Sequence, residues 1–180
     1  MLRRLLGLGA GALAALTAAC DGAPTTQQVY VNERAIGNYT QYSSSPGPLL
    51  VVVHGNPFVT SKPFLDGIVA KELEASITHV ANAHLTADPE LAAKPEFRVI
   101  VALGAHKAVD ANALCAGEPP RLEPGADPML MVAVFCRKDE VISLVRGSIG
   151  AQSSPEDKRF RNWVRQIGRD LFTPGRSSSG

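Results

Sequence analysis

The stretch that most constrains the fold of this chain is residues 49–58, with the sequence LLVVVHGNPF. Its first half is an apolar run without polar alternation, which is typical of a strand buried on both faces of a sheet. Gly55, Asn56 and Pro57 are turn-forming residues that end this strand. The stretch therefore predicts the first central strand of an α/β sheet.

A helix is predicted over residues 61–76, because its apolar residues recur at helical spacing and Pro63 suits a first helical turn. Thr60 or Ser61 is the expected N-cap. The polar residues 78–96 predict a loop, and residues 97–103 (FRVIVAL) predict a second strand. Strand, helix, loop and strand together indicate a right-handed βαβ unit.

The second half of the chain predicts a β-hairpin and a helix. Residues 129–136 (MLMVAVFC) form an unbroken apolar run, and the β-prone residues 141–145 follow closely. Residues 155–172 carry one narrow apolar stripe, with Ser154 as the expected N-cap and Pro155 at the first helical position. We therefore expect a single α/β domain, or alternatively an α+β domain. It would have a mixed sheet of four or five strands with an amphipathic C-terminal helix packed on it.

The first 19 residues predict a secretory signal peptide. Arg3 and Arg4 precede an apolar run over residues 5–19, and small residues lie just before Cys20. A transmembrane anchor is the alternative, but the run of 15 residues is shorter than the roughly 17–25 that span a bilayer.

The segment Leu16-Thr17-Ala18-Ala19-Cys20 resembles the lipobox of bacterial lipoproteins, although Thr17 stands where that family usually has leucine. The resemblance implies cleavage before Cys20 and attachment of a diacylglycerol to its thiol, with acyl chains such as palmitate. Two or more acyl chains hold a protein stably to a membrane. It also implies export to the periplasm-facing side of a bacterial cell envelope, in either membrane.

These features give the chain four parts. Residues 1–19 are the signal peptide, and residues 20–48 hold the lipidated cysteine, a tether and a short edge strand near residues 29–31. Residues 49–173 form the α/β domain, and residues 174–180 are expected to be a disordered tail.

Composition gives no indication of a nucleic-acid binder, and we expect no nucleic-acid partner. Removing the signal peptide takes two of the 18 basic residues, which leaves 16 against 17 acidic residues, a net charge of −1. Cys115 and Cys136 remain as a pair in an exported chain, and this predicts a disulfide bond. Two buried free thiols are the alternative. We expect no metal site and no cofactor, because the chain has no Cys-x-x-Cys spacing.

His54, Asn56 and His106 make up a candidate ligand site. His54 and His106 follow two strands that we expect to be parallel, and open α/β sheets bind ligands at the carboxyl ends of such strands. The segment His54-Gly55-Asn56-Pro57 also resembles the oxyanion loop of α/β-hydrolases such as dehalogenases. That resemblance implies a small envelope hydrolase, but the sequence has no Gly-x-Ser-x-Gly elbow for a nucleophile. We therefore assign no catalytic residues and expect a protein that is not an enzyme.

A basic face on the last helix is a candidate contact for anionic lipid or cell-wall polymer. The alternative is an ordinary solvated helix face. Its residues are Lys158, Arg161, Arg165 and Arg169.

The order of these parts is similar to that in a group of small, uncharacterised bacterial lipoproteins. The residues that carry this resemblance are Cys20, the VVVHGNPF segment, Phe97-Arg98-Val99, Leu114-Cys115, residues 133–136 and the helix over 160–172 that precedes Pro174. The resemblance implies a membrane-anchored envelope lipoprotein that binds or scaffolds without catalysis. Its partners would be the membrane and an envelope protein or cell-wall polymer.

Overall fold

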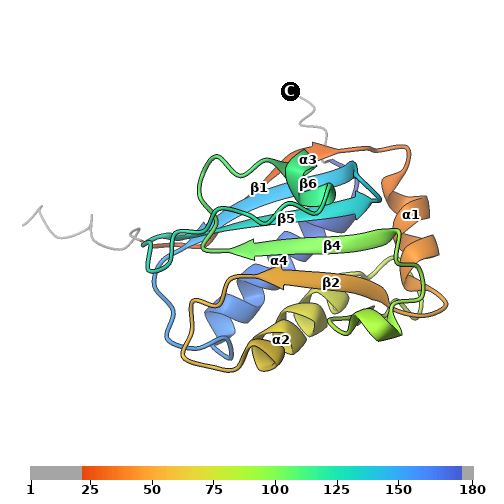
Figure 1. Cartoon of the computed structure of the whole chain (residues 1–180). Coiled ribbons are helices and arrows are strands. Elements are labelled where there is room, and N and C mark those ends of the chain that lie inside the picture. The colour runs from red at the N-terminus through yellow and green to blue at the C-terminus, as the bar shows by residue number, and fades with distance from the viewer. Residues whose placement is uncertain (1–21, 176–180) are drawn as a thin grey trace, which may run out of the picture.

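The computed structural model describes residues 22–175 (Figure 1). The expected signal peptide, the lipidation site Cys20 and most of the expected tail therefore lie outside the described residues. Among the helices of residues 22–175, none combines the length and the apolar character that crossing a membrane requires.

One mixed sheet of six strands forms the centre of the fold, in the order β1-β6-β5-β4-β2-β3. The strands are β1 (Thr25–Val31), β2 (Leu49–His54), β3 (Leu85–Thr86), β4 (Phe97–Leu103), β5 (Met129–Arg137) and β6 (Glu140–Ile149). β2 pairs in parallel with β3 and β4, and the remaining pairs are antiparallel. The single α/β domain, the βαβ unit and the β5–β6 hairpin are confirmed, and the sheet has six strands where four or five were expected.

Helices pack on both faces of this sheet, and one face is covered more fully than the other. The helices are α1 (Ile36–Ser44), α2 (Lys62–Glu74), the 3-10 helix η1 (Pro89–Leu91), α3 (Ala111–Cys115) and α4 (Lys158–Phe172). α2 and α4 lie side by side on one face, and the short α3 lies on the other (Figure 1).

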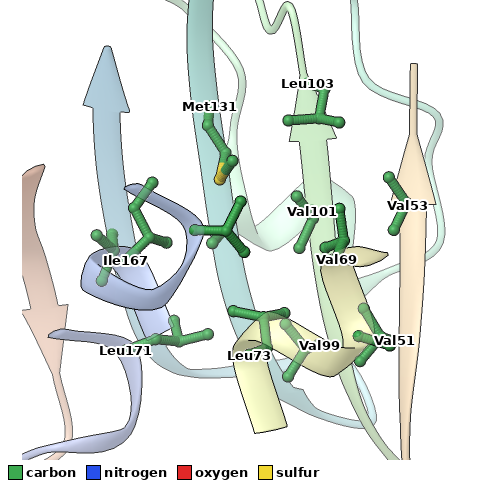
Figure 2. Close-up of a cluster of buried hydrophobic side chains, with 14 of the residues drawn as sticks. Val51, Val53, Val69, Leu73, Val99, Val101, Leu103, Met131, Ile167 and Leu171 are labelled. Atoms are coloured by element: carbon green, nitrogen blue, oxygen red, sulfur yellow. The ribbon is translucent and has the colours of Figure 1, made fainter. Parts of the chain in front are cut away.

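The main core lies between the sheet and the α2–α4 pair. Alternate residues of the strands point into it, as the period of two in a strand requires. Figure 2 shows Val51, Val53, Val99, Val101, Leu103 and Met131 facing Val69 and Leu73 of α2 and Ile167 and Leu171 of α4. The predicted apolar stripe of the last helix is thus the surface that seals the sheet.

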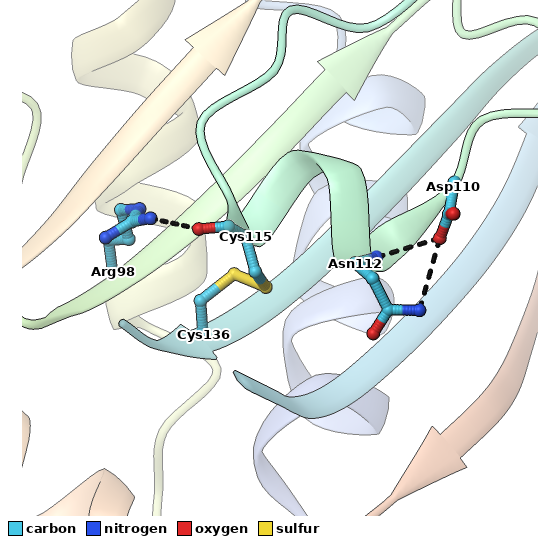
Figure 3. The surroundings of a disulfide bond; sticks show 5 residues. All are labelled: Arg98, Asp110, Asn112, Cys115 and Cys136. Atoms are coloured by element: carbon cyan, nitrogen blue, oxygen red, sulfur yellow. Dashed lines mark hydrogen bonds between the residues drawn. A yellow bond between two sulfur atoms is a disulfide. The ribbon is translucent and has the colours of Figure 1, made fainter. Parts of the chain in front are cut away.

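A smaller core under α3 is closed by a disulfide bond. Cys115 at the end of α3 is bonded to Cys136 in β5, with the two Cα atoms 5.6 Å apart, as Figure 3 shows. Arg98 donates a hydrogen bond to the Cys115 carbonyl, and Asp110 caps α3 by accepting from the Asn112 backbone N–H at 2.9 Å. The predicted Cys115–Cys136 pairing is confirmed.

Several segments differ from the sequence-based expectation, among them β3, which lies within residues 78–96 that were expected to be a loop. β1 begins at Thr25, within the residues expected to be a tether, and α1 occupies a segment for which no helix was predicted. The last helix begins at Lys158 rather than at Pro155, because residues 153–157 form a separate turn. In that turn the Asp157 carboxylate accepts the Ser153 and Ser154 backbone N–H groups, both at 3.1 Å.

α4 approaches α2 closely at Gly168. A Cβ atom placed there would lie 2.2 Å from Ser76 Oγ and 3.1 Å from Leu73 Cδ2. The absence of a side chain at this position therefore sets the separation of the two helices.

Candidate functional site

The parallel strands β2 and β4 end at the same edge of the sheet, where His54 pairs with Ala102. Gly55 follows with a φ angle of +82°, and a Cβ atom there would lie 2.3 Å from the Leu103 carbonyl oxygen. Only glycine allows the chain after β2 to turn this closely against the end of β4. The turn that the sequence predicted therefore also forms one wall at this edge.

A cleft of about 220 Å³ opens at this edge. Its lining comes from five places that are distant in sequence: residues 55–58, 103–104, 122–127, Met129 and residues 151–152. Most of these residues are apolar. A mostly apolar hollow at the carboxyl ends of parallel strands is the usual form and place of a ligand site in an open α/β sheet.

Asn56 lines the cleft, but its amide holds the turn together. Its Nδ2 donates to the Thr60 carbonyl at 2.8 Å, and its Oδ1 accepts from the Phe58 backbone N–H at 3.1 Å. Phe58 is in turn buried edge-on against Phe160, with ring centroids 5.0 Å apart. The polar atoms of Asn56 shape the wall of the cleft.

His54 is half-buried and is not among the residues that line the cleft. Burial lowers the pKa of its imidazole, the positive charge of Lys62 lowers this pKa further, and Asp66 partly opposes the change. Lys62 is fixed nearby because its Nζ donates to the Val53 carbonyl at 2.6 Å and pairs with Asp66. The fold therefore favours the neutral form of His54.

His106 lines a different hollow, of about 580 Å³, beside residues 25–27 and Arg146. Its Nδ1 accepts from the Ala108 backbone N–H at 3.1 Å, and its Nε2 lies 3.5 Å from a Glu123 carboxylate oxygen. Of the three residues of the candidate ligand site, Asn56 lines the cleft, His106 lines the other hollow and His54 lines neither.

Two carboxylates at the rim of the cleft were not singled out from the sequence. Glu123 and Asp127 lie in the irregular segment between α3 and β5, and both are exposed. Asp127 Oδ1 accepts from the Ala151 backbone N–H at 3.1 Å, which joins this segment to the chain after β6. Proline and glycine marked the segment as a loop, but no pattern indicated which sheet edge it covers.

The predicted basic face of α4 is largely paired within the protein. Arg161 Nε lies 2.5 Å from one carboxylate oxygen of Glu72, and Arg165 donates to the other oxygen. The Glu72 side chain is only 1% exposed, so the two guanidinium groups balance a buried charge. Lys158 and Arg169 remain as the exposed members of the predicted face.

The side chains that line the cleft define the chemistry that it offers. Over residues 22–175, the side chains that line it include no hydroxyl, thiol, imidazole or amine. In the same part of the chain, no group of three or more His, Cys, Asp and Glu side chains is placed to hold a metal ion. The lining supplies apolar contacts, backbone groups, two carboxylates and two side-chain amides.

Residues 22–175 thus form an α/β domain with a mixed six-stranded sheet and an apolar cleft at the carboxyl edge of its parallel strands. No protein-family model matches the chain, and no curated protein matches it either. Solved structures similar to it include the PelC dodecamer from Paraburkholderia phytofirmans, in space group P6, and a single-residue variant of that dodecamer in space group C2. The identities are 12% and 13%, the TM-scores are 0.41 and 0.42, and each match covers 84% of this chain and 99% of the other. Likeness at this level carries no argument about this chain.

Proposed function

We propose that this chain is a membrane-anchored lipoprotein of the bacterial cell envelope with a non-catalytic role, and that it binds an apolar ligand in the cleft. The signal-peptide pattern and Cys20 support the anchoring. The observation that carries the binding role is the cleft itself, because its walls are apolar and it lies where this class of sheet binds ligands.

The rim of the cleft defines the class of ligand. Phe58, Leu103 and Leu122 offer an apolar surface, whereas Glu123 and Asp127 place two negative charges at the opening. Opposite charges attract and like charges repel. We therefore expect a ligand with a compact apolar body and a cationic head.

Cyclohexylamine and cyclohexanecarboxylate form a matched pair of probes, because they share the apolar ring and differ in charge. We expect cyclohexylamine to raise the melting temperature of the protein and cyclohexanecarboxylate to leave it unchanged. Ala126→Phe fills the cleft and should abolish the shift, whereas Ala81→Phe at an exposed position should keep it. An equal shift in the Ala126→Phe variant contradicts binding in the cleft, and an equal response to both probes contradicts the preference for a cationic head.

The anchoring is tested on the protein extracted from bacterial membranes. Intact mass should show Cys20 as a lipidated first residue, and Cys20→Ser should release the protein from the membrane fraction. A wild-type chain that is soluble and unmodified contradicts this part of the proposal.

The alternative hydrolase would need a nucleophile next to the residues 54–57 turn. The lining residues offer no hydroxyl or thiol, although Glu123 and Asp127 carry carboxylates, and the Asn56 amide is occupied by the turn. We expect a fluorophosphonate probe to leave the protein unlabelled, and labelling would favour the alternative.

A further inference from the structure

Two large apolar side chains project into solvent just after β2. Val59 is fully exposed and is the most exposed of the large apolar residues in the described chain. Phe64 in the first turn of α2 is 46% exposed. Their neighbour Phe58 is buried, and Asn56 forms two hydrogen bonds across the turn. These contacts fix the segment from which Val59 projects into solvent. Isolated exposed apolar residues are common, and their meaning depends on what lies beside them.

The described chain begins at the same end of the molecule. The Gly22 carbonyl accepts a hydrogen bond from the Gly150 backbone N–H at 3.2 Å and another from Arg159. Gly150 follows the end of β6, and α4 begins near Arg159. The first described residue is therefore fixed to the fold.

The strand register relates Gly22 to the turn after β2. Ile149 of β6 pairs with Met129 of β5, and Met131 pairs with Leu103 at the end of β4. β4 ends beside β2, so the start of β1 and the residues 55–60 turn lie at one end of the sheet. Figure 1 shows the start of the described chain at the end toward which the arrowheads of β2 and β4 point.

We propose that this end of the molecule lies against the membrane and that Val59 and Phe64 insert into the membrane interface. The inference rests on the proposed lipid anchor at Cys20. Cys20 precedes Gly22 by two residues, and an extended chain of that length spans about 7 Å. A diacyl group at Cys20 therefore brings this end of the sheet to the membrane surface.

Charged groups of both signs lie at this end, so the apolar residues contribute most to membrane binding. Lys158 and Arg159 at the start of α4 favour anionic headgroups, but Glu123, Asp127, Glu156 and Asp157 lie at the same end with the opposite sign. Positive and negative groups are therefore mixed at this end, so binding depends on burial of apolar surface in the interface and only weakly on the charge of the lipid.

The test places a tryptophan at the exposed positions of the lipidated full chain. Val59→Trp is compared with Leu91→Trp, because Leu91 is 61% exposed in η1, which lies before the start of β4 at the opposite end. Trp163 is buried and gives both variants the same background. Each protein is reconstituted in phosphatidylcholine–phosphatidylglycerol vesicles with and without brominated acyl chains, which quench tryptophan by contact.

We expect at least a twofold greater loss of fluorescence for Val59→Trp than for Leu91→Trp, with little change when phosphatidylglycerol is left out. Equal quenching of the two variants in an anchored protein overturns the docking and leaves the proposed function intact. A chain that lacks the lipid by intact mass and does not float with vesicles overturns both.

Discussion

Among single residues, His54 is a side chain whose ionisation depends on its position in the fold. It ends β2, half-buried, with Lys62 held close by the Val53 carbonyl and by Asp66. Burial and the nearby positive charge both disfavour the imidazolium ion, so the pKa of His54 lies below its usual value of 6.5. A group of this kind makes the stability of the fold depend on pH.

The direction of that dependence follows from proton binding. As the pH falls below about 6.5, the unfolded chain binds a proton at His54 before the folded protein does, so the free energy of unfolding decreases. His54→Gln removes this titrating group, so its free energy of unfolding should decrease less than that of the wild type between pH 7.5 and pH 5. Urea unfolding across this range measures both proteins. Parallel curves for the two proteins contradict a lowered pKa for His54.

The residues of the cleft show which parts of the site a sequence can predict. Gly55 and Asn56 were expected at a strand end because the apolar run before them stops abruptly. Glu123 and Asp127 were missed, because their place depends on how a proline-rich segment folds back over the sheet. The Glu72 carboxylate between Arg161 and Arg165 was missed for a similar reason, since 89 and 93 residues separate the partners.

At the scale of elements, the packing of α4 on α2 depends on one glycine. Gly168 lies against Ser76, whereas a Cβ atom placed at Gly67 on α2 would meet no heavy atom within 4 Å. Glycine-to-alanine substitution can therefore be compared at an open position on α2 and at a closely packed position on α4.

We expect Gly67→Ala to raise the free energy of unfolding by about 0.5–1 kcal/mol, because alanine is the better helix former. Gly168→Ala should lower it by about 1–3 kcal/mol, because the added methyl group overpacks the helix contact. Urea unfolding at constant pH measures both values. A stabilising effect at Gly168 contradicts close contact between the two helices.

Helices and strands could be predicted from the sequence where their buried side chains are apolar, and could not be predicted where those side chains are polar. Residues 49–53, 99–103 and 129–136 are apolar, and the strands that contain them were expected with nearly correct bounds. α1 was missed because its buried side includes Thr40 and Ser44, which hydrogen-bond to carbonyl groups of their own helix. Hydrophobic periodicity does not detect a surface of this kind.

For the molecule as a whole, the disulfide bond holds the smaller core together. It spans 21 residues and joins α3 to β5 across the face opposite the α2–α4 pair. The layer under α3 contains few large side chains, so the covalent bond is expected to contribute a large share of its stability.

We expect the double variant Cys115→Ala, Cys136→Ala to lose on the order of 3 kcal/mol of unfolding free energy, because a closed loop of this length restricts the unfolded chain. Urea unfolding at pH 7 measures the loss. Treating the wild type with dithiothreitol should produce a similar change, while the double variant should not respond. A loss below about 1 kcal/mol contradicts this role.

The pairing of β1 with β6 also predicts an order for the events of folding. Thr25 pairs with Ser148, so the strand that is synthesised first receives its sheet neighbour more than 100 residues later. Trp163, which donates to the Thr25 carbonyl at 3.0 Å, arrives later still. Contacts of such long sequence separation form slowly, and the parallel β2–β4 core can assemble before them. Until residues 143–148 are in place, Val29 and Tyr30 belong to an unpaired strand, and we expect protection of that segment by a chaperone to aid this chain before it folds.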